Sequence, residues 1–415
     1  MQFYEFKETQ ERVILIGVQI EVGDDVEASL DELEELAETA GAETVAKVIQ
    51  NREAVHPGTY IGKGKIEEVA SLLRALDANG VICDDELSPA QLNNLERELD
   101  CKVMDRTLLI LDIFAGRAVS SEGKIQVELA QLRYRAARLV GLRESLSRLG
   151  GGIGTRGPGE KKLETDRRLI RTRISALKAE LAQVEKHREL IRGKRSRGNL
   201  KTAAIVGYTN AGKSTLLNTL TGAGILAEDK LFATLDPTTR VLELKDGQQI
   251  LLTDTVGFIR KLPHHLVEAF KSTLEEAKYA DYIIHVVDAS NPQAELQMFT
   301  VYETLRELGA TGKKIVTLLN KQDQVTGSGI RDLKADYTVK CSARTGEGLD
   351  EFKDVLAKLL AEDQIYLEEL YPYSEAGKIQ KIREFGSLLS EEYREDGIFV
   401  KARVPAEIFV SVMPK

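Results

Sequence analysis

Short apolar runs alternate with amphipathic helical stretches in the N-terminal part of this chain. The apolar runs have the length of buried strands, and stretches with helical spacing of apolar residues separate them. Strands that alternate with helices of this length predict a small parallel α/β domain over residues 1–115. In chain order, the strand-like and helix-like stretches begin at Val13, Ser29, Ala46, Lys65, Gly80, Ser88 (a helix-capping serine) and Cys101.

Two long helical stripes follow over residues 116–198. A glycine-rich loop, GGGIGTRGPGE from Gly150, separates them, and only Arg167 and Arg188 interrupt the seven-residue repeat of the second stripe. These stripes predict an antiparallel helical hairpin whose tip lies about 35 to 45 Å from its base, at a rise of about 1.5 Å per residue. The apolar positions are Leu129, Leu132, Ala136, Leu139, Leu142, Leu146 and Leu149 in the first stripe and Leu163, Ile170, Ile174, Leu177, Leu181, Val184 and Ile191 in the second.

A second α/β pattern begins at Thr202 and defines a predicted domain over residues 199–362. The remaining residues, 363–415, contain QIYLEEL, a helical stretch near EAGKIQKIREFG, and GIFVKARV. We expect a strand, a helix and a strand in this small C-terminal α+β domain. The predicted fold class is therefore α/β, with four domains in all.

Charge is distributed unevenly over these parts. The whole chain of 415 residues carries a net charge of −9, but residues 117–198 hold 21 Lys and Arg against 9 Asp and Glu. Such a basic segment predicts binding to nucleic acid, with a solvated coiled coil or a dimer seam as the alternative. The three scattered cysteines and the lack of any long apolar stretch predict a reduced, cytoplasmic protein that neither is secreted nor spans a membrane.

The first chemical motif is GYTNAGKST, which follows the apolar strand AAIV and precedes a helical run. Glycines allow backbone amides to approach phosphates, and the helix N-terminus favours negative charge. Lys213 is expected to contact the β- and γ-phosphates of a nucleotide, and Ser214 to ligate magnesium. The expected nucleotide-contacting residues are Gly207, Tyr208, Thr209, Asn210, Ala211, Gly212, Lys213, Ser214 and Thr215.

The motif NKQD indicates which base is bound, because it ends the apolar strand KIVTLL. Asp323 can accept two hydrogen bonds from the N1 and N2 donors of guanine, whereas adenine offers no such donor pair. Asn320 and Lys321 are expected to support the base. The sequence CSA from Cys341 is weaker evidence, since it also fits a buried strand end. It adds Ser342 and Ala343 near the guanine oxygen, with Arg344 beside them.

Two further motifs indicate a nucleotide-dependent switch. In DTVG, Asp254 is expected to hold magnesium through water, and the Gly257 amide to sense the γ-phosphate. In FATLDPTTR, Thr234 is the expected magnesium ligand, with Thr238 and Thr239 as competitors. The expected catalytic residues are Lys213, Thr234 and Gly257; the expected metal ligands are Ser214, Thr234 and Asp254; and the other expected contacts are Phe232, Ala233, Thr255 and Val256.

The ordered motifs resemble those of translation-factor-related GTPases, which implies that residues 199–362 form a Ras-like P-loop GTPase domain with Mg²⁺ as cofactor. With GTYIGKGK from Gly58, the glycine loop and the basic hairpin, the chain resembles the HflX family of ribosome-associated GTPases over nearly all of residues 1–362. GTYIGKGK itself is assigned no nucleotide contact, because its glycines can simply shape a turn.

This resemblance implies a GTP-dependent factor that binds the large ribosomal subunit and splits stalled or idle ribosomes, especially under heat stress. It also implies that the glycine loop reaches towards the peptidyl-transferase region of ribosomal RNA. We expect GTP and GDP as ligands, a monomer, no DNA partner and no stable membrane insertion, with partial membrane association left open. A GTPase of large-subunit assembly is the alternative, whereas a role in tRNA modification is disfavoured, because the terminal sequence VSVMPK lacks a cysteine motif.

One departure bears on the mechanism. Phe258 stands where Ras-like GTPases place a water-orienting glutamine, and its ring can neither donate nor accept a hydrogen bond to water. We therefore expect slow intrinsic hydrolysis, with activation by the ribosome, by potassium near Asn210, or by both. An ordinary loop asparagine is the alternative reading of Asn210.

Overall fold

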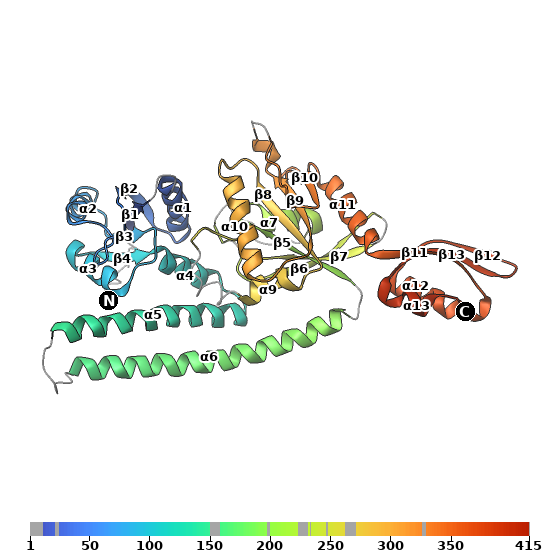
Figure 1. Ribbon diagram of the computed structural model, residues 1–415, viewed down its shortest axis with the longest axis horizontal. Helices are drawn as coiled ribbons and strands as arrows, with labels where there is room; N and C mark the ends of the chain where they lie inside the picture. The colour runs from blue at the N-terminus through green and yellow to red at the C-terminus, as the bar shows by residue number, and fades with distance from the viewer. Residues whose placement is uncertain are drawn as a thin grey trace, which may run out of the picture. The chain divides into compact units, whose positions relative to one another are not determined.

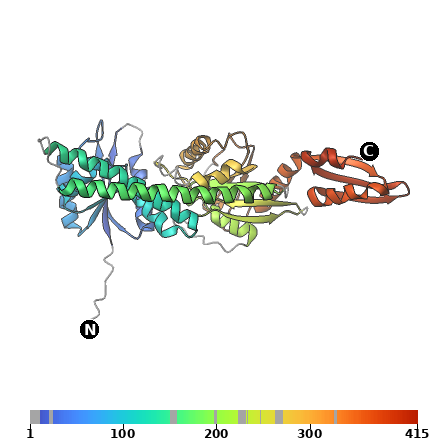
Figure 2. The same ribbon diagram turned by 90° about the horizontal axis from the view of Figure 1, so that it is seen from below.

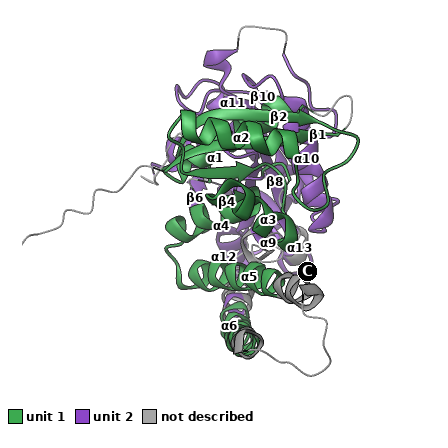
Figure 3. Cartoon of the chain, turned by 90° about the vertical axis from the view of Figure 1, so that its left-hand side faces the viewer, with its two compact units in different colours: residues 1–185, 228–236, 259–273 green, residues 186–227, 237–258, 274–415 purple. Residues whose placement is uncertain are grey.

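The computed structural model describes residues 11–20, 25–149, 158–196, 200–222, 231–232, 234–245, 248–261, 271–325 and 329–414 (Figure 1). The chain forms two compact units (Figure 3). Unit 1 consists of residues 1–185, 228–236 and 259–273, and unit 2 of residues 186–227, 237–258 and 274–415. Two short segments, residues 228–236 and 259–273, thus belong to unit 1 although the residues on either side of them belong to unit 2. The first contains the start of FATLDPTTR, and the second follows DTVG.

Unit 1 begins with a fully parallel four-stranded sheet in the order β2-β1-β3-β4. This confirms the predicted parallel α/β arrangement. The predicted cap at Ser88 is also present, as a capping box in which the Ser88 and Gln91 side chains bond reciprocally to the backbone. The elements are β1 (Arg12–Gln19), α1 (Val26–Thr39), β2 (Glu43–Asn51), α2 (Lys63–Ala75), β3 (Gly80–Cys83), α3 (Pro89–Leu99), β4 (Lys102–Asp105) and α4 (Arg106–Arg117).

Two long helices, α5 (Ser121–Leu149) and α6 (Pro158–Ser196), run side by side as the hairpin (Figures 1 and 2). The contact between them forms from the predicted stripes. Leu129 of α5 and Leu177 of α6 are buried between the two helices, and Leu132, Ile174 and Leu181 pack around them. The glycine-rich loop at residues 150–157 lies outside the described residues.

Unit 2 contains a six-stranded sheet in the order β10-β9-β8-β5-β7-β6, parallel except for β6. The carboxyl ends of its central strands lead into the sequence motifs, as expected for a doubly wound sheet that binds a ligand at that edge. Its elements are β5 (Lys201–Gly207), α7 (Lys213–Thr221), β6 (Thr238–Glu243), β7 (Gln249–Asp254), α9 (Lys271–Tyr279), β8 (Tyr282–Asp288), α10 (Ala294–Glu307), β9 (Lys314–Asn320), β10 (Tyr337–Lys340) and α11 (Leu349–Glu362).

The C-terminal part holds one strand and one helix more than the sequence pattern predicted. Its antiparallel sheet has the order β11-β13-β12, with β11 (Gln364–Tyr371), α12 (Ala376–Phe385), β12 (Ser387–Arg394), β13 (Gly397–Pro405) and α13 (Ala406–Val412). The prediction missed β12 because this edge strand, SLLSEEYR, has only exposed or half-buried side chains and therefore no continuous apolar run.

The structure also describes the cysteines and the lengths of the apolar helices. Cys83, Cys101 and Cys341 are free thiols, the first and last of them buried. No helix in the described part of the chain combines the length and apolar composition needed to cross a bilayer.

Candidate nucleotide site

The phosphate-binding loop joins the buried end of β5 to the first turn of α7. Gly212 precedes α7 with φ +96°, a conformation that L side chains rarely adopt. The backbone therefore turns sharply at Gly212 into α7. The loop residues Tyr208, Thr209, Asn210 and Ala211 come directly before the helix N-terminus, whose free amides favour an anion.

Lys213 is the buried cation of this loop. Its Nζ donates hydrogen bonds to the carbonyl oxygens of Tyr208, at 2.6 Å, and Gly207, at 3.2 Å. Burial lowers the pKa of Lys213 to about 8, and the charge of Asp254 partly opposes this shift. A desolvated ammonium at this point is strongly attracted to polyphosphate, because its charge is screened little by water.

Ser214 and Asp254 meet beside this lysine. The Ser214 Oγ donates to Oδ2 of Asp254 at 2.7 Å, and Asp254, the last residue of β7, is fully buried. A hydroxyl and a carboxylate are the hard oxygen ligands that Mg²⁺ prefers, so this pair fits the metal that the sequence predicts. Thr215 follows in the first turn of α7.

The DTVG segment is joined to the phosphate-binding loop by backbone hydrogen bonds. The Phe258 amide donates to the Gly207 carbonyl at 3.1 Å, and the Thr209 amide donates to the Phe258 carbonyl at 2.8 Å. Gly257 lies so close that a Cβ there would stand 2.9 Å from Lys213 Nζ. Within the segment, Thr255 and Val256 are buried.

Phe258 itself is buried, so its ring lies in the core. This agrees with the expectation that it does not orient water. Its backbone instead fixes the phosphate-binding loop against DTVG.

Asn320 connects three of the motifs. Its Nδ2 donates to the Ala211 carbonyl in the phosphate-binding loop, and its Oδ1 accepts from the Ala343 amide in the CSA segment, each at 2.8 Å. The side chain is buried. Asn320 is predicted to support the base, and in the structure its side chain also holds the two loops together.

Lys321 and Asp323 lie at the carboxyl end of β9. Lys321 Nζ forms an ion pair with Asp288 Oδ2 at 2.8 Å, and the exposed Asp323 lies in the short 3₁₀ helix η1 (Gln322–Gln324). The Gln322 amide donates to the Cys341 carbonyl at 3.2 Å, which brings NKQD beside CSA. The carboxylate proposed to read guanine is therefore presented at the edge of the sheet.

The CSA segment is held from two sides. Ser342 is buried and its Oγ accepts from the Thr345 amide at 3.2 Å, while the Ala343 carbonyl accepts from Thr219 Oγ1 at 2.8 Å. Arg344 is exposed. The supporting residues Thr219 and Asp288 were not predicted from the sequence. Asp288 has a signal, since it is a carboxylate ending the apolar run YIIHVVD, whereas Thr219 has none.

The FATLDPTTR segment divides between the units. Phe232 and Thr234 belong to unit 1, and Ala233 lies outside the described residues. The role of Thr234 as a magnesium ligand therefore stays a prediction. Of its competitors in β6, Thr239 shares a hydrogen bond of 3.0 Å with the Thr253 hydroxyl.

Within unit 1, the same segment packs on the base of the hairpin. The Phe232 ring lies edge-to-face against Phe114, with centroids 4.6 Å apart. Asp236 Oδ2 accepts from the amides of Val119, at 3.1 Å, and Ser120, at 2.8 Å, just before α5 begins. Ser120 caps α5 locally, since its Oγ accepts from the Gly123 amide at 2.9 Å. Asp236, from a distant part of the chain, holds the backbone of this capping residue, and no local signal in the sequence predicts that contact.

Substitution of Gly212 by alanine is expected to weaken GTP and GDP binding together by about tenfold, because strain of this kind costs roughly 1–3 kcal/mol. The new Cβ would meet Asn320 Nδ2 at 2.3 Å and would disturb the junction of the loops. Calorimetric titration measures both affinities. Gly222→Ala is the matched control: Gly222 also has positive φ, at +66°, but a Cβ there meets nothing within 4 Å. Equal affinity losses in both variants would contradict this explanation.

Three family models match the chain in succession. They are described as "GTP-binding GTPase N-terminal" at residues 27–115, "GTP-binding GTPase Middle Region" at residues 117–195 and "50S ribosome-binding GTPase" at residues 202–321. Together they span the N-terminal domain, the hairpin and most of the second α/β domain.

Two curated relatives match over almost their whole length. The chain is 68% identical to GTPase HflX of Lacrimispora saccharolytica, over 99% of this chain and 97% of that protein. It is 42% identical to GTPase HflX of Escherichia coli, over 95% of this chain and 94% of that protein. Among solved structures, a GTP-binding protein from Sulfolobus solfataricus in complex with GDP matches at 26% identity and a TM-score of 0.46, over 84% of this chain and 98% of that chain.

Proposed function

Because this chain belongs to the HflX family of GTPases, we propose that it is a cytoplasmic factor that binds the large ribosomal subunit and dissociates stalled or idle ribosomes. The chain hydrolyses GTP to GDP and phosphate, and in this proposal the bound nucleotide controls its affinity for the subunit. The observation that carries the proposal is the presence, in one chain, of a guanine-nucleotide site and a long basic hairpin.

The hairpin offers the charge that binding to ribosomal RNA requires. Arg168, Arg171 and Lys178 are exposed along α6. Contacts of such side chains with phosphates are largely independent of base sequence and weaken as salt concentration rises. The proposal includes four domains, with the limits 1–115, 116–198, 199–362 and 363–415. In this division the hairpin and the nucleotide site belong to different domains.

In the proposed site, Lys213 binds the β- and γ-phosphates and the Gly257 amide binds the γ-phosphate. Ser214, Asp254 through water, and Thr234 hold Mg²⁺, which offsets charge on the phosphate oxygens. Asp323 accepts hydrogen bonds from guanine. The other residues named from the motifs line the phosphates and the base.

Hydrolysis in this proposal depends on help from outside the site. The buried ring of Phe258 leaves the attacking water without a side-chain partner at that position. The large subunit, or potassium beside Asn210, supplies the missing alignment or charge. The sequence also leaves open that both act together.

Sedimentation of intact ribosomes tests the proposed function. With a non-hydrolysable GTP analogue we expect the protein to convert intact ribosomes into subunits and to migrate with the large subunit, and with GDP we expect neither. Reversal of two hairpin charges, in Arg168→Glu with Arg171→Glu, is expected to reduce large-subunit binding about tenfold or more. Reversal of the exposed Arg97 on α3 is the control.

The two candidate functions give different profiles. Ribosomes that stay intact while the protein migrates with free large subunits would overturn dissociation and favour the assembly alternative. Migration that ignores the nucleotide would contradict both.

A further inference from the structure

The carboxyl edge of the N-terminal sheet carries an acidic cluster, Asp84 and Asp85. The strand order reverses between β1 and β3, which is the position where open α/β sheets bind ligands. Asp84 and Asp85 follow β3 directly at this point. Asp84 is fully buried, and Ser29 Oγ from α1 and Arg106 from α4 each donate a hydrogen bond of 2.8 Å to its carboxylate.

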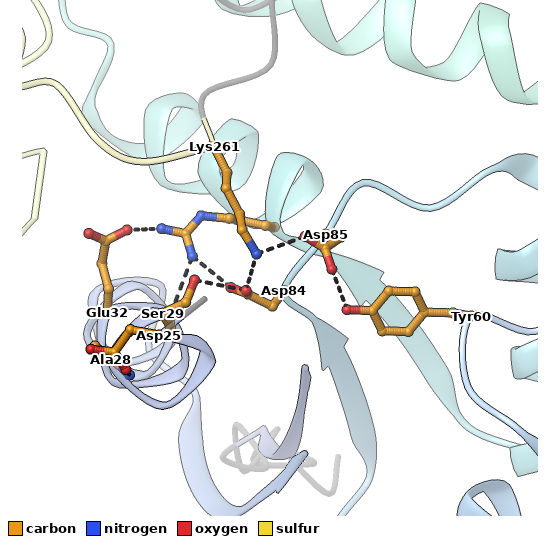
Figure 4. Close-up of polar contacts among 9 residues, drawn as sticks. Asp25, Ala28, Ser29, Glu32, Tyr60, Asp84, Asp85 and Lys261 are labelled. Atoms are coloured by element: carbon orange, nitrogen blue, oxygen red, sulfur yellow. Dashed lines mark hydrogen bonds and ion pairs between the residues drawn. The ribbon is translucent and has the colours of Figure 1, made fainter. Parts of the chain in front are cut away.

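A lysine from the segment after DTVG binds to this acidic cluster (Figure 4). Lys261 Nζ donates to Asp84 Oδ2 at 2.5 Å and to Asp85 Oδ1 at 2.7 Å. Tyr60 Oη donates to the other oxygen of Asp85 at 2.7 Å. All of these residues belong to unit 1, which includes residues 259–273. Lys261 has φ +53°, a conformation that a non-glycine residue keeps where its surroundings hold it.

Charge balance explains why the lysine binds there. Arg106 is buried and pairs with Glu32 as well as with Asp84, so one guanidinium serves two carboxylates. Asp85 adds a third negative charge. Burial raises the pKa of Asp84, and the nearby Lys261 ammonium counteracts this shift. A buried carboxylate with an incomplete counter-charge is unfavourable, and the lysine supplies the missing cation.

Lys261 stands close in the chain to Gly257, the expected γ-phosphate contact. It is the fourth residue after Gly257. At one end of the intervening stretch, the Phe258 backbone is hydrogen-bonded to the phosphate-binding loop; at the other end, Lys261 is held by the two aspartates. Both contacts therefore hold residues within four positions of Gly257, the first inside unit 2 and the second inside unit 1.

We propose that the acidic cluster is a docking site for the segment after DTVG, and that Lys261 is a positioning residue that pre-organises Gly257 for the γ-phosphate. Pre-organisation of the Gly257 amide lowers the entropic cost of GTP binding. GDP has no γ-phosphate, so its binding does not benefit from an ordered Gly257. The inference rests on the proposed role of Gly257. It assigns to the N-terminal domain a direct contribution to the discrimination of GTP from GDP.

Calorimetry on the full-length chain with Mg²⁺, a non-hydrolysable GTP analogue and GDP tests this proposal. Lys261→Gln is expected to weaken binding of the analogue at least about fivefold while binding of GDP changes less than about twofold. Lys261→Arg retains the charge and is expected to restore most of the preference. Asp85→Asn removes the half-exposed partner and should reproduce part of the loss without leaving Asp84 unpaired.

Lys47 provides a matched control. Its ammonium also pairs with two carboxylates, Asp31 and Glu34, and it is similarly exposed, but it lies on β2 and contacts no residue of the DTVG segment in the described structure. Lys47→Gln should leave both affinities unchanged. Melting temperatures of all variants report any general loss of stability.

The outcomes separate this proposal from the one it rests on. Equal weakening of both nucleotides in Lys261→Gln, an unchanged preference, or a Lys261→Arg variant as weak as Lys261→Gln would overturn docking. A wild-type chain that binds the analogue and GDP equally well would instead overturn the role of Gly257, and with it the premise of the inference.

Discussion

Replacement of Lys213 by alanine is expected to reduce the rate of GTP hydrolysis about a thousandfold or more. The Lys213 ammonium is buried among the carbonyls of the phosphate-binding loop, where its charge acts on the phosphates with little screening by water. Loss of one well-placed donor to developing charge costs about a hundred- to a thousandfold, and loss of a buried cation also weakens binding of the ground state. Single-turnover phosphate release measures the rate, and titration with GDP measures binding.

Lys201→Ala is the control for Lys213→Ala. Lys201 begins the same strand, β5, but its ammonium pairs with Asp281 and is partly exposed. We expect its removal to leave hydrolysis within about twofold, since surface ion pairs contribute little. Hydrolysis by Lys213→Ala within tenfold of wild type would contradict the proposed role of Lys213.

Replacement of Asp323 by asparagine is expected to change which purine the protein binds. The carboxylate accepts from both N1 and N2 of guanine, whereas an asparagine amide offers one acceptor and one donor. Xanthine presents an N1 donor beside a C2 carbonyl, which matches that amide. We expect affinity for GTP to fall about a hundredfold or more and affinity for xanthosine triphosphate to rise, because unpaired polar groups in a binding site are strongly rejected.

Direct competition between the two nucleotides measures this exchange. Asp323 is exposed in η1, so its substitution should leave folding intact. Glu347→Gln, at an exposed position that follows CSA, makes the same chemical change and should leave the preference for GTP unaltered. If the Asp323→Asn variant still prefers GTP to xanthosine triphosphate, Asp323 does not read the base.

Much of the chemistry could be predicted because it depends on residues close together in the chain. The strand before GYTNAGKST, the helix after it and the lysine between them form one local unit, and Ser88 caps its helix through residues three positions away. The parallel N-terminal sheet follows from the alternation of strands and helices. In contrast, β12 escaped prediction because an exposed edge strand has no periodic apolar signal.

The strands and helices of the N-terminal domain and the basic character of the hairpin could be predicted from the sequence alone, and the phosphate-binding and guanine-reading motifs are predictions of the same kind. Local periodicity, backbone conformation and side-chain chemistry are properties of short segments. The contacts of Asn320 with two loops, of Asp236 with the backbone before α5, and of Lys261 with Asp84 became visible only in the folded chain. These contacts join residues from 23 to 177 positions apart, and no local pattern encodes them, because closure of the whole fold selects which polar groups are buried together.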